Sequence, residues 1–560
     1  MIKESFNFLD LLKKKEYSKI LSIIDGEKQE GEITSDLLNL SGFCRMMLNE
    51  SNDSIKIAMS DFKKSYYKET DENKSVERFK NLINASVIYF DNEFIKKENV
   101  LGEEFFDEII SIFNKKKNLF ENNLSVMKVI LKVFKRKSNL KNVLDCLKKT
   151  IKLSADIDSI VSYVYFNNYL YDWSQSDYLK NSEILNNELA TYSSNELVEL
   201  KDTKNEKINL GFISSDLKSK HSITYFFRSI ILNYNKDKFN IYLYHNHNVE
   251  DDTTKEFEKY VFKTFHISHL KDIDVINKIR KDEIDIIIDL NGFSSNHRLA
   301  LFKNRLARIQ ILWCGYTNTS GLKEMDYLIL DKNLITSNEE NLYSEKIIYL
   351  PNIWNCHSGY NLQRTENEMP FKKNKFITFG SFNNFLKIND DVVEVWSSIL
   401  KKVKKSKLVL KTSISISQEE YKKKFEKYGV LDSIIFLKYD KNFDDHLNKY
   451  KQIDIALDTF PWNGVTTSFE AVWMNVPVVV MNGYNYNSRC GYSIIKNLKL
   501  PNLLAEDKKD YIDKAVSLAQ NQEKLLQIRK KIFQNALNSP LFDKKKFSED
   551  FFSLIQKIYK

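Results

Sequence analysis

Through the first two hundred residues, apolar side chains recur every three or four positions, with charged residues between them. The pattern is clear in FDEIISIFNKKKNLF, LSVMKVILKVFKRK and NVLDCLKKTIKL. This period places the apolar side chains on one face of an α-helix. Glycine and proline, which interrupt helices, are scarce over the same range. We therefore predict an all-α domain over residues 1–200.

One part of this range suggests a helical repeat. The segment LSGFCRMMLNESNDSIKIAMSDFKKSYY resembles a tetratricopeptide unit through Gly42, Ala58 and Phe62, although the spacing departs from that repeat by several residues. The prediction is a degenerate, tetratricopeptide-like domain, and an irregular helical domain is the alternative.

The pattern changes near residue 205, where short apolar runs alternate with helical or polar stretches. The runs are KINLGFISSD, FNIYLYH, IDIIIDL, IQILWCG, DYLILD and KIIYLP, and then FITFGSF, KLVLKT, SIIFLKY, IDIALDTF and VPVVVM. Such alternation is typical of mainly parallel sheets covered by helices. The polar stretch 363–375 between the two series is predicted to be a linker. We expect two α/β lobes, 201–365 and 366–560, with a ligand cleft at the carboxyl ends of their strands.

Composition narrows the class of protein. Mean hydropathy is −0.43, and no apolar run approaches the length of a membrane span. The N-terminus has no unbroken apolar segment of the kind found in signal peptides. The five cysteines are scattered and odd in number, which favours a reducing, cytoplasmic setting. Net charge is +9, from 85 basic and 76 acidic residues. We expect this modest excess to be spread along the chain and not to serve nucleic acid.

The stretch ALDTFPWNGVTTSFEAVWM contains a candidate phosphate site. An apolar run ends at Asp458, a turn with Gly464 follows, and a helix is predicted to begin at Thr466. A helix N-terminus offers unpaired N–H groups and partial positive charge to an anion, and threonine hydroxyls add further donors. Because the P-loop and G-x-G-x-x-G patterns are absent, an ordinary Ser/Thr helix cap is the alternative.

The eight histidines all lie between His221 and His446. The pairs at 245/247 and 266/269 lack further ligands at zinc-binding spacing, so we expect no metal site. His221 follows a predicted strand and His446 begins a predicted helix, positions from which both can face the cleft.

Four motifs then resemble one known family. They are INLGFISSDLKSKHSITYFF, IQILWCGYTNTSGLKEMDYLILD, FITFGSFNNFLKI and DTFPWNGVTTSFEAVWMNVPVVVM. In sequence and order they resemble the catalytic region of the O-GlcNAc transferase family, and most of all its SPINDLY-like branch, over roughly residues 205–560. The segment NNYLYDWSQSDYL is similar to the helical lead-in of bacterial members.

The resemblance implies a fold and an activity. The fold is GT-B: two Rossmann-like lobes that hold a nucleotide sugar between them, preceded by tetratricopeptide helices. The activity is transfer of one sugar to Ser or Thr of a protein, with inversion and without a required metal or other cofactor. The helical domain would bind the protein acceptor.

The resemblance also implies roles for individual residues. Lys387 matches the lysine that contacts the donor diphosphate, and Asn384 stands where a glutamine or asparagine lies near it. His446 matches the histidine that packs against the nucleotide base. Thr466 and Thr467 match the hydroxyl pair at the phosphate.

Other matched positions leave the donor open. Glu470 occupies the acidic position that binds the ribose hydroxyls, and His221 matches a first-lobe histidine once proposed as the base. Val465 replaces a histidine of the animal enzymes, Lys449 replaces an arginine, and Glu470 replaces an aspartate. The plant SPINDLY branch, which uses GDP-fucose, also has glutamate there. UDP-GlcNAc is the expected donor, with GDP-fucose to Ser/Thr or UDP-glucose to Asn as alternatives.

The expected chemistry needs donors for a departing diphosphate and an acceptor for one proton. Lys387 and the helix end at Thr466 would stabilise the negative charge that develops on the leaving group. His221 is the candidate base, because an unperturbed histidine titrates near 6.5. An oxygen of the donor phosphate or a chain of waters is the alternative base. A catalytically inactive helical scaffold is a third reading, which the presence of Lys387 and His446 argues against.

Overall fold

The structure, a computed structural model, describes residues 8–30, 33–48, 51–96, 103–201, 206–366, 368–411, 418–438, 440 and 442–560. It divides into two compact units. The first is Met1–Ala155, and the second is Asp156–Ile414 with Gln418–Lys560. Each unit is described by itself below.

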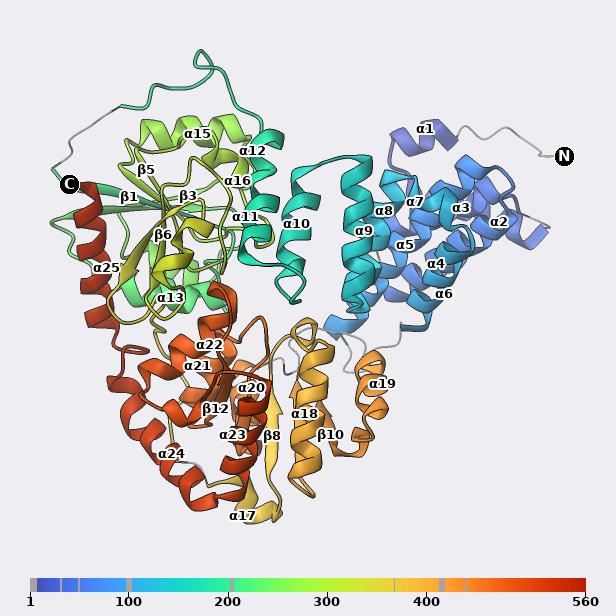
Figure 1. The fold of residues 1–560 in the computed structure, drawn as a ribbon. Coiled ribbons are helices and arrows are strands. Elements are labelled where there is room, and N and C mark those ends of the chain that lie inside the picture. Colours follow the sequence, from blue (N-terminus) through green and yellow to red (C-terminus); the bar gives the residue numbers. More distant parts are fainter. Residues whose placement is uncertain are drawn as a thin grey trace. The chain divides into compact units, whose positions relative to one another are not determined.

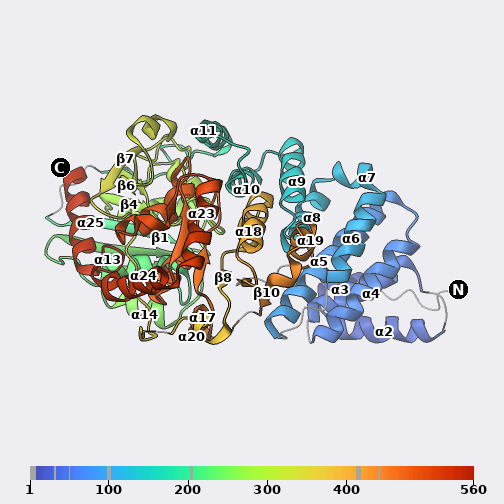
Figure 2. The ribbon, with the colours of Figure 1, turned by 60° about the horizontal axis from the view of Figure 1, so that its bottom comes forward.

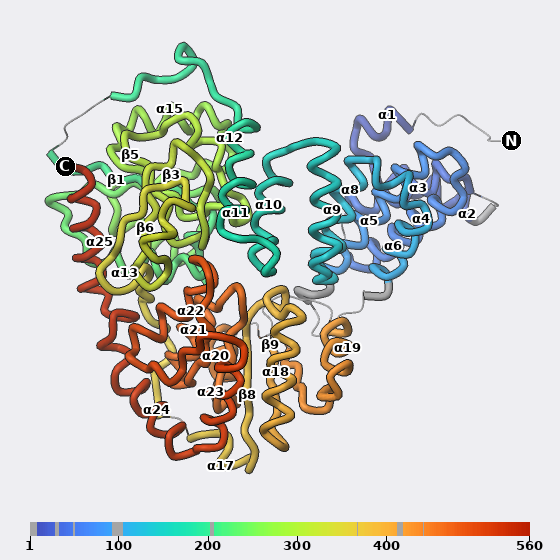
Figure 3. The backbone as a smooth tube through the Cα atoms, in the orientation of Figure 1, coloured from blue at the N-terminus to red at the C-terminus, as the bar shows by residue number. Residues whose placement is uncertain are grey.

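The first unit is all-α, as the apolar spacing predicts (Figure 3). Its helices are α1 (Phe8–Lys13), α2 (Tyr17–Glu30), α3 (Ser35–Leu48), α4 (Asn52–Lys68), α5 (Glu72–Lys96), α6 (Glu103–Lys115), α7 (Lys117–Glu121), α8 (Leu124–Arg136) and α9 (Leu140–Leu153). Several successive helices, such as α3 with α4 and α8 with α9, pack on one another. The buried face of α8 carries Val126, Ile130 and Val133, at the three- and four-residue spacing of the sequence.

The division between the units falls at residue 155, whereas the sequence suggests a helical domain as far as residue 200. The helices α10 (Ile157–Asn167), α11 (Gln175–Glu183) and α12 (Leu185–Glu188) belong to the second unit. Side chains at their ends bind the first α/β lobe: Asn168 Nδ2 donates to Tyr316 Oη at 3.3 Å, and Gln175 Nε2 donates to Asn318 Oδ1 at 2.7 Å. Periodicity alone could not reveal which domain these helices would join.

The first lobe of the second unit is a seven-stranded parallel sheet in the order β3-β2-β1-β4-β5-β6-β7. Its strands are β1 (Ile208–Ser214), β2 (Phe239–His245), β3 (Lys263–His266), β4 (Ile286–Asp289), β5 (Ile309–Leu312), β6 (Tyr327–Asp331) and β7 (Lys346–Leu350). Its helices are α13 (Ser222–Ile231), α14 (Asp252–Glu258), α15 (Asp272–Lys281) and α16 (Leu299–Phe302), with a 3-10 turn at Ser337–Leu342.

The second lobe is a six-stranded parallel sheet in the order β10-β9-β8-β11-β12-β13. Its strands are β8 (Thr378–Ser381), β9 (Lys407–Lys411), β10 (Ile434–Leu437), β11 (Ile455–Leu457), β12 (Val478–Met481) and β13 (Leu504–Ala505). Its helices are α17 (Pro370–Asn374), α18 (Asp390–Lys402), α19 (Glu419–Lys427), α20 (Phe443–Lys449), α21 (Thr466–Trp473), α22 (Tyr486–Asn497), α23 (Lys508–Gln520) and α24 (Gln522–Asn535). In both lobes the strand order reverses beside the first strand, as in Rossmann-like sheets.

These sheets confirm the predicted class, two Rossmann-like lobes preceded by helices (Figures 1 and 2). Every apolar run named above forms a strand. The sequence missed β3 and β13, because β3 is an only partly buried edge strand and β13 has two residues. Among the described residues, no helix is both long and apolar enough to span a bilayer.

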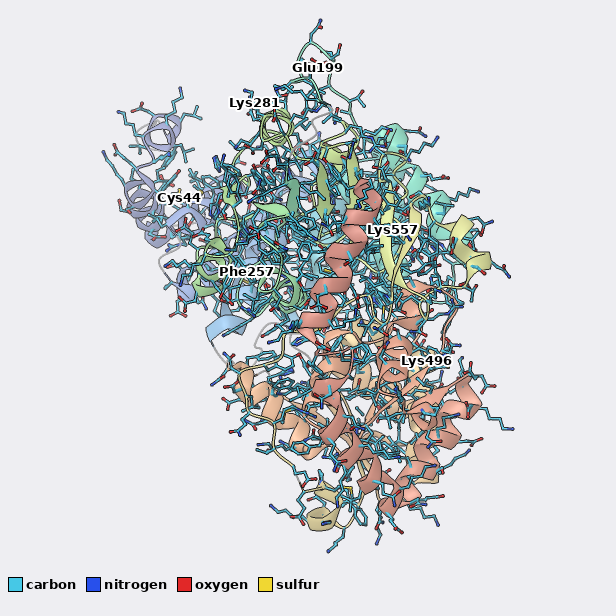
Figure 4. All side chains as sticks on the ribbon, turned by 90° about the vertical axis from the view of Figure 1, so that its left-hand side faces the viewer. Cys44, Glu199, Phe257, Lys281, Lys496 and Lys557 are labelled. Carbon is cyan, nitrogen blue, oxygen red and sulfur yellow. The ribbon has the colours of Figure 1, made fainter. Side chains whose placement is uncertain are left out.

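The chain crosses between the lobes twice. Residues 351–369 lead from the first sheet to the second lobe, and the last helix, α25 (Lys544–Tyr559), returns to the first lobe (Figure 4). There it packs on α13. Ser548 Oγ donates to the carbonyl of Ile230 at 3.1 Å. The two crossings are bonded to each other, because the backbone N–H of His357 donates to the carbonyl of Leu541 at 2.8 Å.

Candidate active site

A cavity of about 340 Å³ lies between the two lobes, beside the carboxyl ends of β8, β9 and β11. This is the edge at which the strand order of the second sheet reverses, where Rossmann-like sheets bind ligands. Both lobes contribute to the wall. It is lined by Lys220, His221, Ser222, Tyr225, Phe382, Lys411, Asp440, Phe443, His446, Thr466, Thr467 and Glu470. The wall includes five of the eight residues singled out from the sequence: His221, His446, Thr466, Thr467 and Glu470.

The amino end of α21 faces this cavity, and the helix begins at Thr466 as predicted. Its cap residue is Val465, and among the described residues no side-chain oxygen caps the helix. The hydroxyl of Thr467 donates instead to Asn383 Oδ1 at 3.0 Å. A Cβ on Gly464 would lie 2.5 Å from Thr467 Oγ1, so the turn into the helix requires glycine. The threonines therefore do not act as ordinary caps, and the amino end of the helix, with its partial positive charge, lies at the cavity wall.

A hydrogen-bonded network of buried polar side chains forms the wall around His446. Its Nδ1 lies 2.7 Å from Lys411 Nζ, and its Nε2 lies 3.0 Å from Glu470 Oε2. The same carboxylate oxygen accepts from Tyr450 Oη at 2.8 Å. An ammonium at Nδ1 requires a lone pair there, which places the ring proton on Nε2, directed at Glu470. The ring is thereby fixed between Phe382 and Phe443, whose centroids lie 5.7 and 5.5 Å away.

Lys411 is a cavity residue that the sequence interpretation missed. It is 2% exposed at its side chain and ends β9, and its Nζ lies 3.3 Å from Asp440 Oδ2. Burial lowers the pKa of Lys411, and Asp440 opposes that shift. A lysine that ends a buried apolar strand was the available signal, since such positions lie at the ligand edge of a parallel sheet.

Lys387 lies behind the loop that leads into α21 and is absent from the described wall of the cavity. Its Nζ donates to the carbonyl of Asn463 at 2.7 Å and lies 5.1 Å from the centroid of the Trp462 ring. Burial lowers the pKa of Lys387 to about 8, and the nearby carboxylate of Asp458 opposes part of the shift. The lysine therefore places positive charge beneath the amino end of α21.

Asp458 is a second residue that the sequence interpretation did not assign. It follows β11, is 1% exposed, and accepts at Oδ1 from the backbone N–H groups of Gly464 (2.7 Å) and Thr459 (2.8 Å). Burial raises the pKa of Asp458 to about 7, while these bonds and Lys387 act in the opposite direction. The carboxylate thus fixes the same loop that Lys387 binds.

Two further predicted residues lie outside the described wall. Asn384 accepts at Oδ1 from the N–H of Leu386 at 3.0 Å, and so caps the short turn that carries Lys387. Lys449 is half-exposed, with its Nζ 4.0 Å from Asp440 Oδ1. Contacts of Asn384 and Lys449 with a donor stay predictions.

His221 enters the cavity from the first lobe, where it caps α13. Its Nδ1 accepts from the N–H of Ile223 at 3.4 Å, and its Nε2 lies 3.6 Å from Asp216 Oδ1. Burial lowers the pKa of His221, and Asp216 opposes the shift. The imidazole is therefore neutral near pH 7, with its proton on Nε2. To accept a proton at Nδ1, the ring must give up its bond to Ile223.

Three of the four paired histidines, His245, His247 and His266, lie together where β2 and β3 end. The His245 ring centroid is 4.9 Å from that of His247 and 5.4 Å from that of His266. Among the described residues, no group of three or more histidine, cysteine, aspartate or glutamate side chains is arranged to hold a metal ion. The metal independence of the reaction stays a prediction.

The two facing lobes, with this cavity at the switch point of the second sheet, define a glycosyltransferase of the GT-B class. The chain belongs to glycosyl transferase family 41, whose model matches residues 179–363 and 362–551. The resemblance of the four motifs is thereby confirmed.

Known relatives agree with this placement. The "Probable UDP-N-acetylglucosamine--peptide N-acetylglucosaminyltransferase SPINDLY" of Solanum lycopersicum is 30% identical over 364 residues, covering 63% of this chain and 38% of that protein. The protein of the same description from Eustoma exaltatum subsp. russellianum is 32% identical over 354 residues, covering 61% and 38%. The chain thus spans less than two fifths of the length of these relatives.

A solved structure matches nearly the whole chain. A mutant of Thermobaculum terrenum O-GlcNAc transferase superposes with a TM-score of 0.77 at 20% identity, covering 94% of this chain and 98% of that one. At this identity the likeness establishes the fold.

Proposed function

We propose that this protein transfers a single sugar from a nucleotide sugar to Ser or Thr of protein acceptors, with inversion at the sugar carbon. The observation that carries the proposal is the cavity between the lobes, which combines the amino end of α21 with the fixed His446–Glu470 pair. UDP-GlcNAc is the first candidate donor, because the names of the family relatives specify UDP-N-acetylglucosamine and peptide.

The arrangement suits the departure of a nucleoside diphosphate. Cleavage of the sugar–phosphate bond leaves negative charge on the phosphate, and preorganised N–H donors aimed at that charge lower the barrier. The α21 amino end supplies such donors, and Lys387 places a cation beneath the loop that precedes it. The flat faces of His446, Phe443 and Phe382 suit a nucleobase, while Glu470 can accept hydrogen bonds from ribose hydroxyls.

The acceptor hydroxyl must lose a proton as it attacks. His221 is the first-lobe candidate for the base, since it lines the cavity and is neutral near pH 7. The bond from Ile223 to its Nδ1 favours the alternative, in which a donor phosphate oxygen takes the proton and His221 positions the substrates.

A second candidate is a related transferase with another donor, either GDP-fucose to Ser/Thr or UDP-glucose to Asn. The identity of Glu470 and Val465 favours it, because the matched positions are aspartate and histidine in the animal enzymes. A catalytically inactive scaffold is disfavoured because five of the predicted site residues, His221, His446, Thr466, Thr467 and Glu470, line one cavity.

A panel of nucleotide sugars tests the donor. The full chain is melted with UDP-GlcNAc, GDP-fucose and UDP-glucose, each in magnesium and in EDTA, and hydrolysis of each donor is followed. We expect UDP-GlcNAc to raise Tm and to be hydrolysed equally in both buffers, because the amino end of α21 and Lys387 would supply the positive charge that the diphosphate needs. A response confined to another donor would select the second candidate, and loss of binding in EDTA would refute metal independence.

A further inference from the structure

The excess of basic over acidic residues in this protein is concentrated in one segment of the helical unit. Residues 115–152 contain twelve lysines and arginines but only two acidic residues. Since the whole chain has 85 basic and 76 acidic residues, the remainder has 73 and 74. The entire net charge therefore lies between the end of α6 and the end of α9, which corrects the expectation that it is spread along the chain.

The same segment contains a cavity of about 320 Å³, nearly as large as the one between the lobes. Its floor is apolar and consists of the buried side chains of Phe113, Met127, Phe134 and Cys146. Its rim is polar and comes from the end of α6, from α7 and from α9. The rim residues are Asn114, Lys117, Glu121, Asn142, Asp145, Lys148, Lys149 and Lys152. We call this cavity the basic groove.

Charge on the rim is unevenly balanced: four lysines, Lys117, Lys148, Lys149 and Lys152, lie there with two carboxylates, Glu121 and Asp145. Glu121 is paired with Lys149 at 2.8 Å and with Lys117 at 3.4 Å, so one carboxylate faces two cations. Lys148 and Lys152 are exposed and lie four residues apart on α9, which places them on the same side of that helix. A ligand on the groove therefore meets a surplus of ammonium groups above an apolar floor.

We propose that the basic groove binds an acidic protein segment that carries an apolar side chain. The carboxylates would pair with the rim lysines, and the apolar side chain would pack on the phenylalanine floor. Identifying that segment as part of the acceptor rests on the proposed function. The groove would then select substrates with acidic sequence near the modified residue.

The chemistry of the groove favours a protein segment over a nucleic acid. A phosphate backbone binds best to a continuous positive surface, whereas here Glu121 and Asp145 interrupt the rim. The rings of Phe113 and Phe134 line the floor of the groove, below its rim, where a single side chain can insert but successive bases cannot stack on an open surface. An apolar pocket with a charged rim is the arrangement that anchors a protein side chain.

The test uses the full chain and a short fluorescein-labelled peptide of Glu, Asp and Leu, with binding followed by anisotropy in the absence of nucleotide sugar. We expect binding that weakens as salt is raised, because the pairs are solvent-exposed. The double variant Lys148→Glu/Lys152→Glu should weaken binding by about ten-fold, since it replaces two attractions by two repulsions. A peptide with Ser in place of Leu should bind more weakly.

The matched control is Lys56→Glu/Lys64→Glu, which reverses two exposed lysines of α4 in the same unit and should leave binding unchanged. Circular dichroism checks folding. If the charge reversal unfolds the protein, the milder Lys148→Gln/Lys152→Gln variant replaces it, and we expect this variant to bind the peptide about three-fold more weakly than the wild type. The proposal is overturned if groove and control variants bind alike. It is also overturned if a single-stranded oligonucleotide or phosphatidylserine vesicles bind more tightly than the peptide. Donor hydrolysis without peptide tests the proposed function separately.

Discussion

The side-chain nitrogen of Lys387 donates a hydrogen bond of 2.7 Å to the carbonyl oxygen of Asn463. Asn463 belongs to the loop that leads to the amino end of α21, so the lysine joins the end of β8 to the element that faces the cavity. Its charge acts on the site from behind this loop.

Replacing Lys387 by alanine should reduce transfer by about 10²–10³-fold, because it removes a cation beneath the site of the departing diphosphate. The measurement is initial rate at saturating donor. Lys404→Ala, at an exposed lysine of the same lobe, is the matched control. If the Lys387→Ala protein melts normally and keeps more than about a tenth of the wild-type rate, Lys387 does not act on the departing diphosphate.

Activity should fall on the alkaline side of neutrality. Since burial lowers the pKa of Lys387 from 10.5 to about 8, the free protein loses this charge near pH 8. We therefore expect kcat/KM for the donor to decline above about pH 8, because this parameter reports the free enzyme. Lys387→Arg stays charged and should lose the decline, although its rate is lower. An identical alkaline limb in both proteins would assign it to another group.

Asp458 should make stability depend on pH in the acid range. Burial raises its pKa from 3.8 to about 7, so between these values the folded protein holds a proton that the unfolded chain has released. The free energy of unfolding contributed by this group therefore decreases as pH rises through that window. Asp458→Asn cannot titrate, and its Tm relative to wild type should increase from about pH 5 to about pH 7. The control is Asp513→Asn, at an exposed aspartate. If the Tm difference between Asp458→Asn and the wild type does not change with pH, Asp458 is not the titrating group.

Lys411 should act on donor affinity. Lys411→Met removes the ammonium that lies 2.7 Å from His446 Nδ1, so the ring is no longer held in one tautomer. We expect KM for the donor to rise by about ten-fold, the effect of one lost charged hydrogen bond, with a smaller change in kcat. Lys407→Met at the other end of β9 should leave KM unchanged. A fall in kcat alone would contradict a role in donor binding.

The role of His221 can be separated from its role as a helix cap. His221→Asn retains an oxygen that can accept from the N–H of Ile223, so α13 keeps its cap. If His221 is the base, turnover falls by about 10²-fold or more while the Kd of the donor is unchanged. A fall in turnover of less than about ten-fold would indicate that a phosphate oxygen of the donor, and not His221, accepts the proton.

Deleting residues 1–155 should impair modification of protein acceptors more than hydrolysis of the donor. The whole described wall of the donor cavity lies in the second unit, which this deletion leaves intact. Both activities are followed in a truncated protein whose melting is cooperative. Equal loss of both would contradict an acceptor-binding role for the helices.

The sequence predicts most of the sheet architecture because parallel strands are buried on both faces and so appear as continuous apolar runs. All seven residues of β1 are buried, for example, whereas β3 is an edge strand with none. The helix start at Thr466 was predictable for a similar local reason. Gly464 marks a turn just before it, and the stretch lies between two apolar runs that predict strands.

The wall of the site was harder to predict because it depends on contacts between distant segments. Lys411, at the end of β9, and His446, in α20, are 35 residues apart in the sequence, and only the fold brings their side chains together. The position of Lys387 behind the loop depends on the path of residues 459–465, which no periodicity describes. Asp458 and Lys411 do share a local signal, a charged residue at the end of an apolar strand.

The double crossing between the lobes limits how the donor cavity can open. Residues 351–369 and the segment before α25 both connect the lobes, and the N–H of His357 donates to the carbonyl of Leu541 where the two segments meet. A single flexible linker would permit twisting and sliding in any direction. Two connections joined by a hydrogen bond restrict these motions, so we expect the cavity to open mainly by rotation of the lobes about the place where the connections meet.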